Sequence, residues 1–199
     1  MEDIRNSWHK EPGSRIEGSG DLDISKLQAP GIARIPTGGY RLFYTAVGPA
    51  KPYPNCQGYI LSAVSEDGLL FYKEPGVRLA PQPELAHMSL RIIAPTITQG
   101  ENGLWRMYFE SRGSADISTV ICSAVSKDML HWKHEEGIRL QGFEGVRAPR
   151  YFRLADGRGR LCCIAVESRG ADRRSQIVSA VTADGLSFVW EPGFLLRDR

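Results

Sequence analysis

The sequence predicts an all-β protein: a β-propeller with three complete four-stranded antiparallel blades and one further outer strand at the N-terminus. A seven-residue motif recurs four times, and its shared glycine lies at positions 13, 76, 137 and 193, in steps of 63, 61 and 56 residues. Each repeat contains four short β-branched or aromatic runs bounded by turn residues, which is typical of strands. No segment has the periodicity of a long amphipathic helix. A radial repeat of four antiparallel strands with this period indicates propeller blades.

The strands follow the same order in every repeat. The first begins with Ala-Pro and ends in a glycine-rich hairpin turn, the second is apolar or aromatic, the third contains Ser-Ala-Val, and the fourth carries one aromatic residue. The Ala-Pro pairs begin at Ala29, Ala94 and Ala148, the second strands lie at 40–44, 105–109 and 160–164, the third strands lie at 60–64, 121–125 and 177–181, and the aromatic residues of the fourth strands are Phe71, Trp132 and Phe188.

Two repeated turn motifs contain acidic residues, and we expect both to be structural. Asp67, Asp128 and Asp184 lie in Ser-x-Asp or Thr-x-Asp turns, where Asp and Ser side chains bond to their own backbone. The Glu-Pro-Gly motif is expected to form a turn at the end of the fourth strand.

The repeats divide the chain into a partial blade and link at 1–27 and complete blades at 28–80, 91–141 and 147–197, all in one domain. The N-terminal outer strand is expected around Trp8 to Ile16. Propellers have about 4 to 8 blades, so three blades and one strand cannot close a ring with normal geometry. The chain is therefore either a fragment of a longer protein or a subunit that associates with a second copy. We expect a homodimer, because open sheet edges are normally paired or covered.

The composition excludes several classes of protein. The 199 residues are 42% hydrophobic and 24% charged, with a net charge of +2, so neither a nucleic-acid footprint nor a membrane-surface patch is indicated. No apolar run is long enough to span a membrane, and the N-terminus lacks signal-peptide features. Four cysteines without a Cys-x-x-Cys pair predict reduced thiols and a cytoplasmic protein without zinc. Nucleotide-binding fingerprints are absent, so no cofactor is expected.

Three patterns carry a resemblance to a known superfamily: Ala94-Pro95-Thr96-Ile97, the Gly-x-x-Arg-Met-Tyr-Phe pattern of residues 103–109, and Ser-Ala-Val-Ser-x-Asp-Gly. They resemble the five-bladed propellers of the arabinanase, β-xylosidase, invertase and levansucrase superfamily, and are similar to the mannoside phosphorylases. The resemblance implies an axial pocket at the starts of the innermost strands, with carboxylates beside the Ala-Pro position. Here those positions are alanines, and 147–149 is similar to Arg-Asp-Pro with the acid removed. This departure argues against ordinary glycoside hydrolysis, which needs two carboxylates flanking the scissile bond.

The candidate site lies where two kinds of connection share one face of each blade: the link into the first strand and the link between the second and third strands. The tetrapeptide Glu-Ser-Arg-Gly occurs at 110–113 and again at 167–170. We expect Glu110 and Glu167 to occupy equivalent positions on neighbouring blades and to act as acid and base. His87 is a further titratable group. The expected substrate-binding residues are Asp23, Arg91, Arg112, Arg147 and Arg169, whose arginines suit anionic groups. Alternatively, each glutamate pairs with the nearby arginine and holds its loop.

The sequence thus favours an enzyme that acts on a carbohydrate-like or other polar oxygenated small molecule by carboxylate acid–base chemistry in an axial pocket. Two alternatives stay open: a non-hydrolytic cyclase or isomerase of a natural product, and a non-catalytic sugar- or anion-binding propeller or fragment. No metal is expected, because neither His-x-x-x-His nor an acidic loop of calcium type is present.

Overall fold

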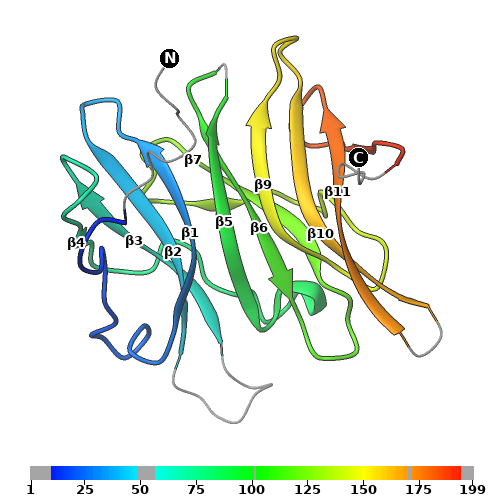
Figure 1. Cartoon of the computed structure of the whole chain (residues 1–199), viewed down its shortest axis with the longest axis horizontal. Coiled ribbons are helices and arrows are strands. Elements are labelled where there is room, and N and C mark those ends of the chain that lie inside the picture. Colours follow the sequence, from blue (N-terminus) through cyan, green and yellow to red (C-terminus); the bar gives the residue numbers. More distant parts are fainter. Residues whose placement is uncertain (1–9, 49–56, 101, 170–171, 194–199) are drawn as a thin grey trace.

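The computed structural model describes residues 10–48, 57–100, 102–169 and 172–193, and these residues form three antiparallel blades (Figure 1). The first blade contains β1 (Leu27–Arg34), β2 (Tyr40–Val47), β3 (Gly58–Ser65) and β4 (Tyr72–Lys73). The second contains β5 (Arg91–Gln99), β6 (Trp105–Arg112), β7 (Val120–Ser126) and β8 (Lys133–His134), and is preceded by the 3-10 helix η2 (Ala86–Met88). The third contains β9 (Val146–Arg153), β10 (Gly159–Arg169), β11 (Asp172–Thr182) and β12 (Val189–Trp190). The predicted all-β propeller fold is confirmed.

The first strand of each blade is the innermost one. Figure 1 shows β1, β5 and β9 side by side at the centre, and the sheets fan outward from them. Within each blade the strands pair antiparallel in sequence order. Neighbouring blades are joined at their inner ends by parallel contacts, Gly58 with Arg91 and Thr119 with Gly145. These contacts bring the links between blades to one end of the molecule.

The Glu-Pro-Gly motif follows directly on the end of the fourth strand, as predicted: β4, β8 and β12 end at Lys73, His134 and Trp190. In the first blade Lys73 pairs with Ala63, the chain then bulges outward, and Leu79 returns to pair with Ile60. The motif thus ends the fourth strand, and an isolated bridge returns the chain to the third strand beyond it.

A repeated ionic cluster fastens this bulge. The Glu74 carboxylate accepts hydrogen bonds from Arg41 Nε and Nη2 at 2.8 and 2.7 Å and from Ser62 Oγ at 2.7 Å. The same arrangement joins Arg106, Ser123 and Glu135 in the second blade. In the third blade Glu191 accepts from Arg160 Nη2 and from Ser179 Oγ, without the bond from Nε. The glutamate of the repeated motif thus binds its own blade together.

The Asp residues of the other repeated turn are structural, as predicted. Asp184 Oδ1 accepts the backbone N–H groups of Leu186 and Ser187, both at 2.8 Å, and Asp67 and Asp128 make the same pair of bonds in their own turns. The backbone donors favour the ionised form, and they hold the pKa of Asp184 below its ordinary value.

Apolar side chains fill the spaces between the blades. Phe43, Ile60 and Leu79 of the first blade pack against Met107 and Phe109 of the second. A second cluster joins the second and third blades: Tyr108, Ile121, Leu140, Val146, Leu161, Cys163, Ala165, Val178 and Ala180. The second blade, which lies between two others, therefore buries both faces of its sheet.

The expected N-terminal outer strand lies only partly within the described residues. Residues 10–16 contain no strand, and Trp8 lies outside the described ranges. Ile16 nevertheless packs against Tyr44 and Ala63 of the first blade. Within these ranges, no helix is long and apolar enough to cross a membrane.

Candidate functional site

A cavity of about 240 Å³ lies between the second and third blades, at the end where β5 and β9 begin. The structure brings three of the predicted site residues together here: Arg91 starts β5, Arg112 ends β6, and Arg147 is the second residue of β9. Thr119, Asp116 and Glu144 also line it. We call this space the arginine cavity. It lies at the mouth predicted from the two kinds of connection.

Glu110 lies next to this cavity, and its carboxylate is hydrogen-bonded to other groups of the protein. Its side chain is 3% exposed. One carboxylate oxygen accepts from Arg112 Nε at 2.5 Å, and the other accepts from the backbone N–H of Ala148 at 3.0 Å. These contacts fit the loop-holding interpretation, because both oxygens already have donors.

The first blade shows what the Glu110 position does. Thr45 pairs with Ile60 across the sheet as Glu110 pairs with Ile121, so the two residues are equivalent. Thr45 Oγ1 accepts the backbone N–H of Ala94 at 2.9 Å. In both cases the donor is the alanine of the next blade's Ala-Pro bulge, which has φ of 57° at Ala94 and 49° at Ala148. The position links one blade to the next.

Glu167 is not equivalent to Glu110, which corrects the prediction from the shared tetrapeptide. Ile164 pairs with Ile177 as Glu110 pairs with Ile121, so Ile164 is the residue equivalent to Glu110. Glu167 lies three residues further along the longer β10–β11 hairpin, opposite Arg174. Strand alternation puts Glu167 on the same face as Ala165, which packs toward the second blade. The main chain of Arg169 lies in β10, but its side chain is outside the described part of the structure.

The other two predicted residues lie elsewhere. His87 is half-buried in η2, and its carbonyl accepts from Ser111 Oγ at 2.8 Å. Asp23 lines a separate cavity beside the first blade and is paired with Lys73. Burial alone would raise the pKa of Asp23, but hydrogen bonds from Lys73 and from the backbone of Gly20 and Ser19 outweigh it and lower the pKa. Asp23 is thus not brought together with the arginines.

Three lining residues had no predicted role. Glu144 Oε1 accepts the Ser168 N–H at 2.7 Å, and Asp116 accepts from Ser114 Oγ. The location of Glu144 in the link before β9 was a usable signal, since that link leads to the mouth. No sequence signal indicated that Asp116 and Thr119 line the cavity, because their positions depend on the path of the β6–β7 loop.

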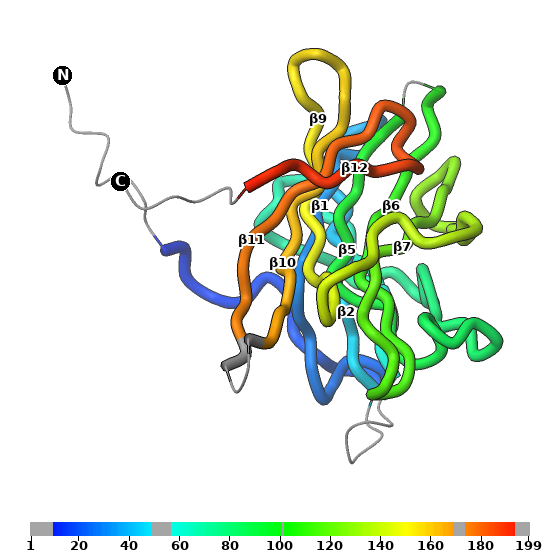
Figure 2. The backbone as a smooth tube through the Cα atoms, turned by 90° about the vertical axis from the view of Figure 1, so that its right-hand side faces the viewer, coloured from blue at the N-terminus to red at the C-terminus, as the bar shows by residue number. Residues whose placement is uncertain are grey.

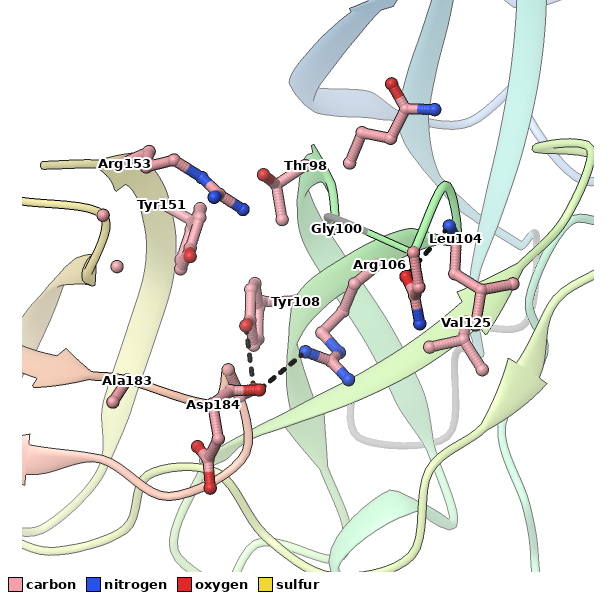
Figure 3. Close-up of a pocket in the computed structure, with 15 residues that line it drawn as sticks. Thr98, Gly100, Leu104, Arg106, Tyr108, Val125, Tyr151, Arg153, Ala183 and Asp184 are labelled. Carbon is pink, nitrogen blue, oxygen red and sulfur yellow. Dashed lines mark hydrogen bonds between the residues drawn. The ribbon is translucent and has the colours of Figure 1, made fainter.

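A second cavity, of about 340 Å³, lies between the same two blades at their other end (Figure 3). Tyr108 and Tyr151 stack there with ring centroids 5.0 Å apart. Tyr108 Oη donates to the Gly185 carbonyl at 2.8 Å, and Arg106 Nη1 donates to the Asp184 carbonyl at 3.3 Å. Burial raises the pKa of Tyr108. Through these two hydrogen bonds, Arg106 and Tyr108 join the second blade to the third.

Among the residues that the structure describes, no group of three or more His, Cys, Asp or Glu side chains is placed to hold a metal ion.

Comparison with known proteins gives the fold. No family model matches the sequence, and no curated protein matches it. The structure is similar to a putative glycoside hydrolase from Parabacteroides distasonis, with a TM-score of 0.68 and 13% identity over 85% of this chain and 51% of that one. It is also similar to a family 117 glycoside hydrolase from Zobellia galactanivorans, with a TM-score of 0.70 and 20% identity over 90% and 60% of the two chains. A β-1,2-mannobiose phosphorylase from Listeria innocua gives 0.64 and 14% over 81% and 56%.

These neighbours define the class of the fold: it is that of the propeller glycoside hydrolases and mannoside phosphorylases. The predicted resemblance is confirmed at this level. The chain spans between about half and three fifths of the length of these structures. At such identities the likeness concerns the fold, and the chemistry has to be argued from this chain's own residues.

Proposed function

We propose that this protein recognises a carbohydrate-like, oxygen-rich ligand in the arginine cavity. The observation that carries the proposal is the convergence of Arg91, Arg112 and Arg147, from two neighbouring blades, on one cavity at the inner ends of the strands. Concave sites that gather a few convergent polar groups are the usual places where small ligands bind.

The composition of the cavity suits sugars. Guanidinium groups donate paired hydrogen bonds to carboxylates or adjacent hydroxyl groups, and carboxylates accept from hydroxyl groups. Three arginines are matched by the carboxylates of Glu110, Asp116 and Glu144 in or beside the cavity. Since the charges balance, we propose a neutral or singly anionic saccharide and not a polyanion.

The structure gives two reasons to favour recognition over hydrolysis of a glycosidic bond. The three Ala-Pro positions carry no acid. Glu110, whose carboxylate lies nearest to Arg112, has both oxygens occupied by protein donors. Hydrolysis of the usual kind needs two carboxylates free to flank the scissile bond.

The test is titration calorimetry with a panel of neutral and uronic-acid oligosaccharides. Arg147→Gln removes one charged donor from the cavity, and Arg153→Gln is the matched control at the opposite end of the same blade interface. Loss of one charged hydrogen bond costs about 1.5–3 kcal/mol, so affinity should fall by roughly 10- to 100-fold in Arg147→Gln and stay unchanged in the control. Equal affinities in both variants would refute the site.

A second candidate is acid–base catalysis such as isomerisation or cyclisation of a polar small molecule. It is favoured by Glu167, which lies on the face of β10 that turns toward the second blade and its arginines. Glu167→Gln should then lower turnover by about 10²- to 10⁴-fold with folding intact. Normal turnover in Glu167→Gln would remove this candidate.

A further inference from the structure

Glu144, in the link before β9, has an equivalent in the link before β5. Leu90 and Glu144 each precede the residue that makes the parallel contact between neighbouring blades. Leu90 donates its backbone N–H to the Arg112 carbonyl of its own blade at 3.0 Å. Glu144 makes the same bond to the Val166 carbonyl, at 2.8 Å. Since this bond forms with leucine as well as with glutamate, the fold does not require an acid at this position.

Leu90 and Glu144 both line the arginine cavity, so its two links present an apolar and an acidic side chain at equivalent positions. Arg147 departs from the repeat in the same way. It pairs with Ile164 as Ile93 pairs with Glu110, and so lies where the second blade has isoleucine. Of the two links and the strands that follow them, only those of the third blade carry charges at these positions. This difference points to a role in binding and not in folding.

The link holds Glu144 in a strained turn at the rim of the cavity. Phe143 has a φ of 55°, a left-handed conformation that is unusual for a bulky residue and is kept only where the surroundings impose it. Its ring packs edge to face on Trp190, with ring centroids 5.6 Å apart. The Ser168 N–H donates to Glu144 Oε1 at 2.7 Å. The carboxylate is thus positioned before a ligand arrives, which lowers the cost of ordering it on binding.

The residue after Glu144 packs the link against the cavity wall. A Cβ atom at Gly145 would lie 2.3 Å from Thr119 Oγ1, and Thr119 lines the cavity. Figure 2, which views the molecule from the side of the third blade, shows the chain entering β9 through this link. The link and the wall are therefore in direct contact, and Glu144 cannot be treated as a loop residue remote from the site.

Glu144 brings a negative charge to a cavity that is otherwise rich in arginine. Arg91, Arg112 and Arg147 attract anions. A carboxylate at the rim repels a carboxylate of the ligand and accepts hydrogen bonds from hydroxyl groups. Because Glu144 is exposed, water weakens the repulsion, and its expected effect on affinity is several-fold and not many orders of magnitude.

We propose that Glu144 is the specificity-determining residue of the arginine cavity, where it favours neutral saccharides over saccharides that carry a carboxylate. The inference rests on the proposed function and narrows its ligand class to neutral sugars. In this arrangement the arginines donate to hydroxyl oxygens, Glu144 accepts from a hydroxyl group, and Leu90 offers an apolar surface to the C–H groups of the sugar ring.

The test compares neutral and uronic-acid oligosaccharides of the same length and linkage by titration calorimetry. The wild-type chain should bind the neutral member of each pair more tightly. Glu144→Gln keeps the size of the side chain and an oxygen for the Ser168 N–H but removes the charge. The ratio of the two affinities should therefore move toward the uronic acid by about three- to tenfold. Glu144→Leu, which has the residue type of the equivalent link, should move the ratio in the same direction.

Glu66→Gln is the charge-matched control, because Glu66 lies at an exposed turn of the first blade and does not line the cavity. It should leave the ratio unchanged. An equal shift in Glu66→Gln would show that net charge alone decides the preference, and would overturn the role of Glu144. A wild-type chain that prefers the uronic acid would overturn it too, as would an unchanged ratio in Glu144→Gln.

Failure of this role can be told apart from failure of the site. If Arg147→Gln weakens binding of the neutral sugar while Glu144→Gln leaves the ratio unchanged, the site stands and the role of Glu144 is wrong. If the wild-type chain binds neither member of the pair, or Arg147→Gln leaves affinity unchanged, the arginine cavity is not the binding site and both proposals are wrong.

Discussion

The carboxylate of Glu110 in the second blade accepts the backbone N–H of Ala148 in the third at 3.0 Å. It is also paired with Arg112 at 2.5 Å. Glu110→Ala would remove the acceptor of the Ala148 N–H and one charged partner of Arg112. Unsatisfied groups of this kind cost about 1–3 kcal/mol each, and we expect the free energy of unfolding to fall by about 2–4 kcal/mol in urea titrations.

Thr45→Val provides the comparison, because Thr45 makes the same link to Ala94 without a charge. It should cost about 1–2 kcal/mol. A Glu110→Ala chain with unchanged stability but lost turnover would show that the residue is catalytic and not a link between blades.

The alanines of the Ala-Pro bulges have a left-handed backbone conformation. Replacing alanine by glycine usually lowers the free energy of unfolding, but at these positions it should leave it unchanged or raise it. At Ala29, with φ of 51°, the conformation costs alanine about 1–2 kcal/mol, and glycine removes this cost while losing about 0.4–1 kcal/mol in unfolded-state entropy. Ala29→Gly should therefore be neutral or stabilising by up to about 1 kcal/mol. Ala165→Gly, in the buried interior of β10, should destabilise by about 1 kcal/mol or more. Equal losses in both would contradict the bulge argument.

The half-buried pair of Arg106 and Glu135 should matter more than an exposed pair. Glu135→Gln breaks a two-point ion pair and its contact with Ser123, and we expect a loss of about 2 kcal/mol after allowance for solvent exposure. Asp156→Asn removes the exposed pair with Arg158 and should leave the urea midpoint unchanged within error. A similar midpoint shift in both would show that burial does not decide the effect.

Stability should fall in acid partly through Asp184. Its pKa is lowered in the folded state by the backbone N–H groups of Ser187 and Leu186, so its contribution is full above the unfolded pKa of about 3.9 and is lost as the pH falls toward the lower folded value. The stability difference between wild type and Asp184→Asn should therefore shrink as the pH is taken from 7 to below 4. Glu66→Gln, at an exposed turn position, is the control. A difference that does not change with pH would refute this linkage.

The strand order and blade pattern were predictable because each strand is a short local run bounded by turn residues. The structural role of Asp67 and its equivalents was predictable for the same reason, since the side chain bonds to its own turn. The outer strand at Trp8 to Ile16 could not be judged locally, because a strand forms only where another strand pairs with it.

The candidate site shows where local patterns fail. Glu110 and Glu167 lie in identical tetrapeptides, but the β10–β11 ladder continues to Arg169 and Asp172, and the tetrapeptide of the third blade lies three residues further along its strand. Hairpin length depends on cross-strand pairing, which the tetrapeptide does not encode. The convergence of Arg91, Arg112 and Arg147 was predictable, because it follows from which strand ends share one edge of the blades.

The most direct test of the account is a crystal structure of the protein soaked with an oligosaccharide that binds in calorimetry. The account predicts sugar density in the cavity between the second and third blades, with hydroxyl or carboxylate oxygens within hydrogen-bond distance of Arg112 and Arg147. Density at the opposite end, beside Tyr151 and Arg153, with the arginine cavity holding only water, would contradict it.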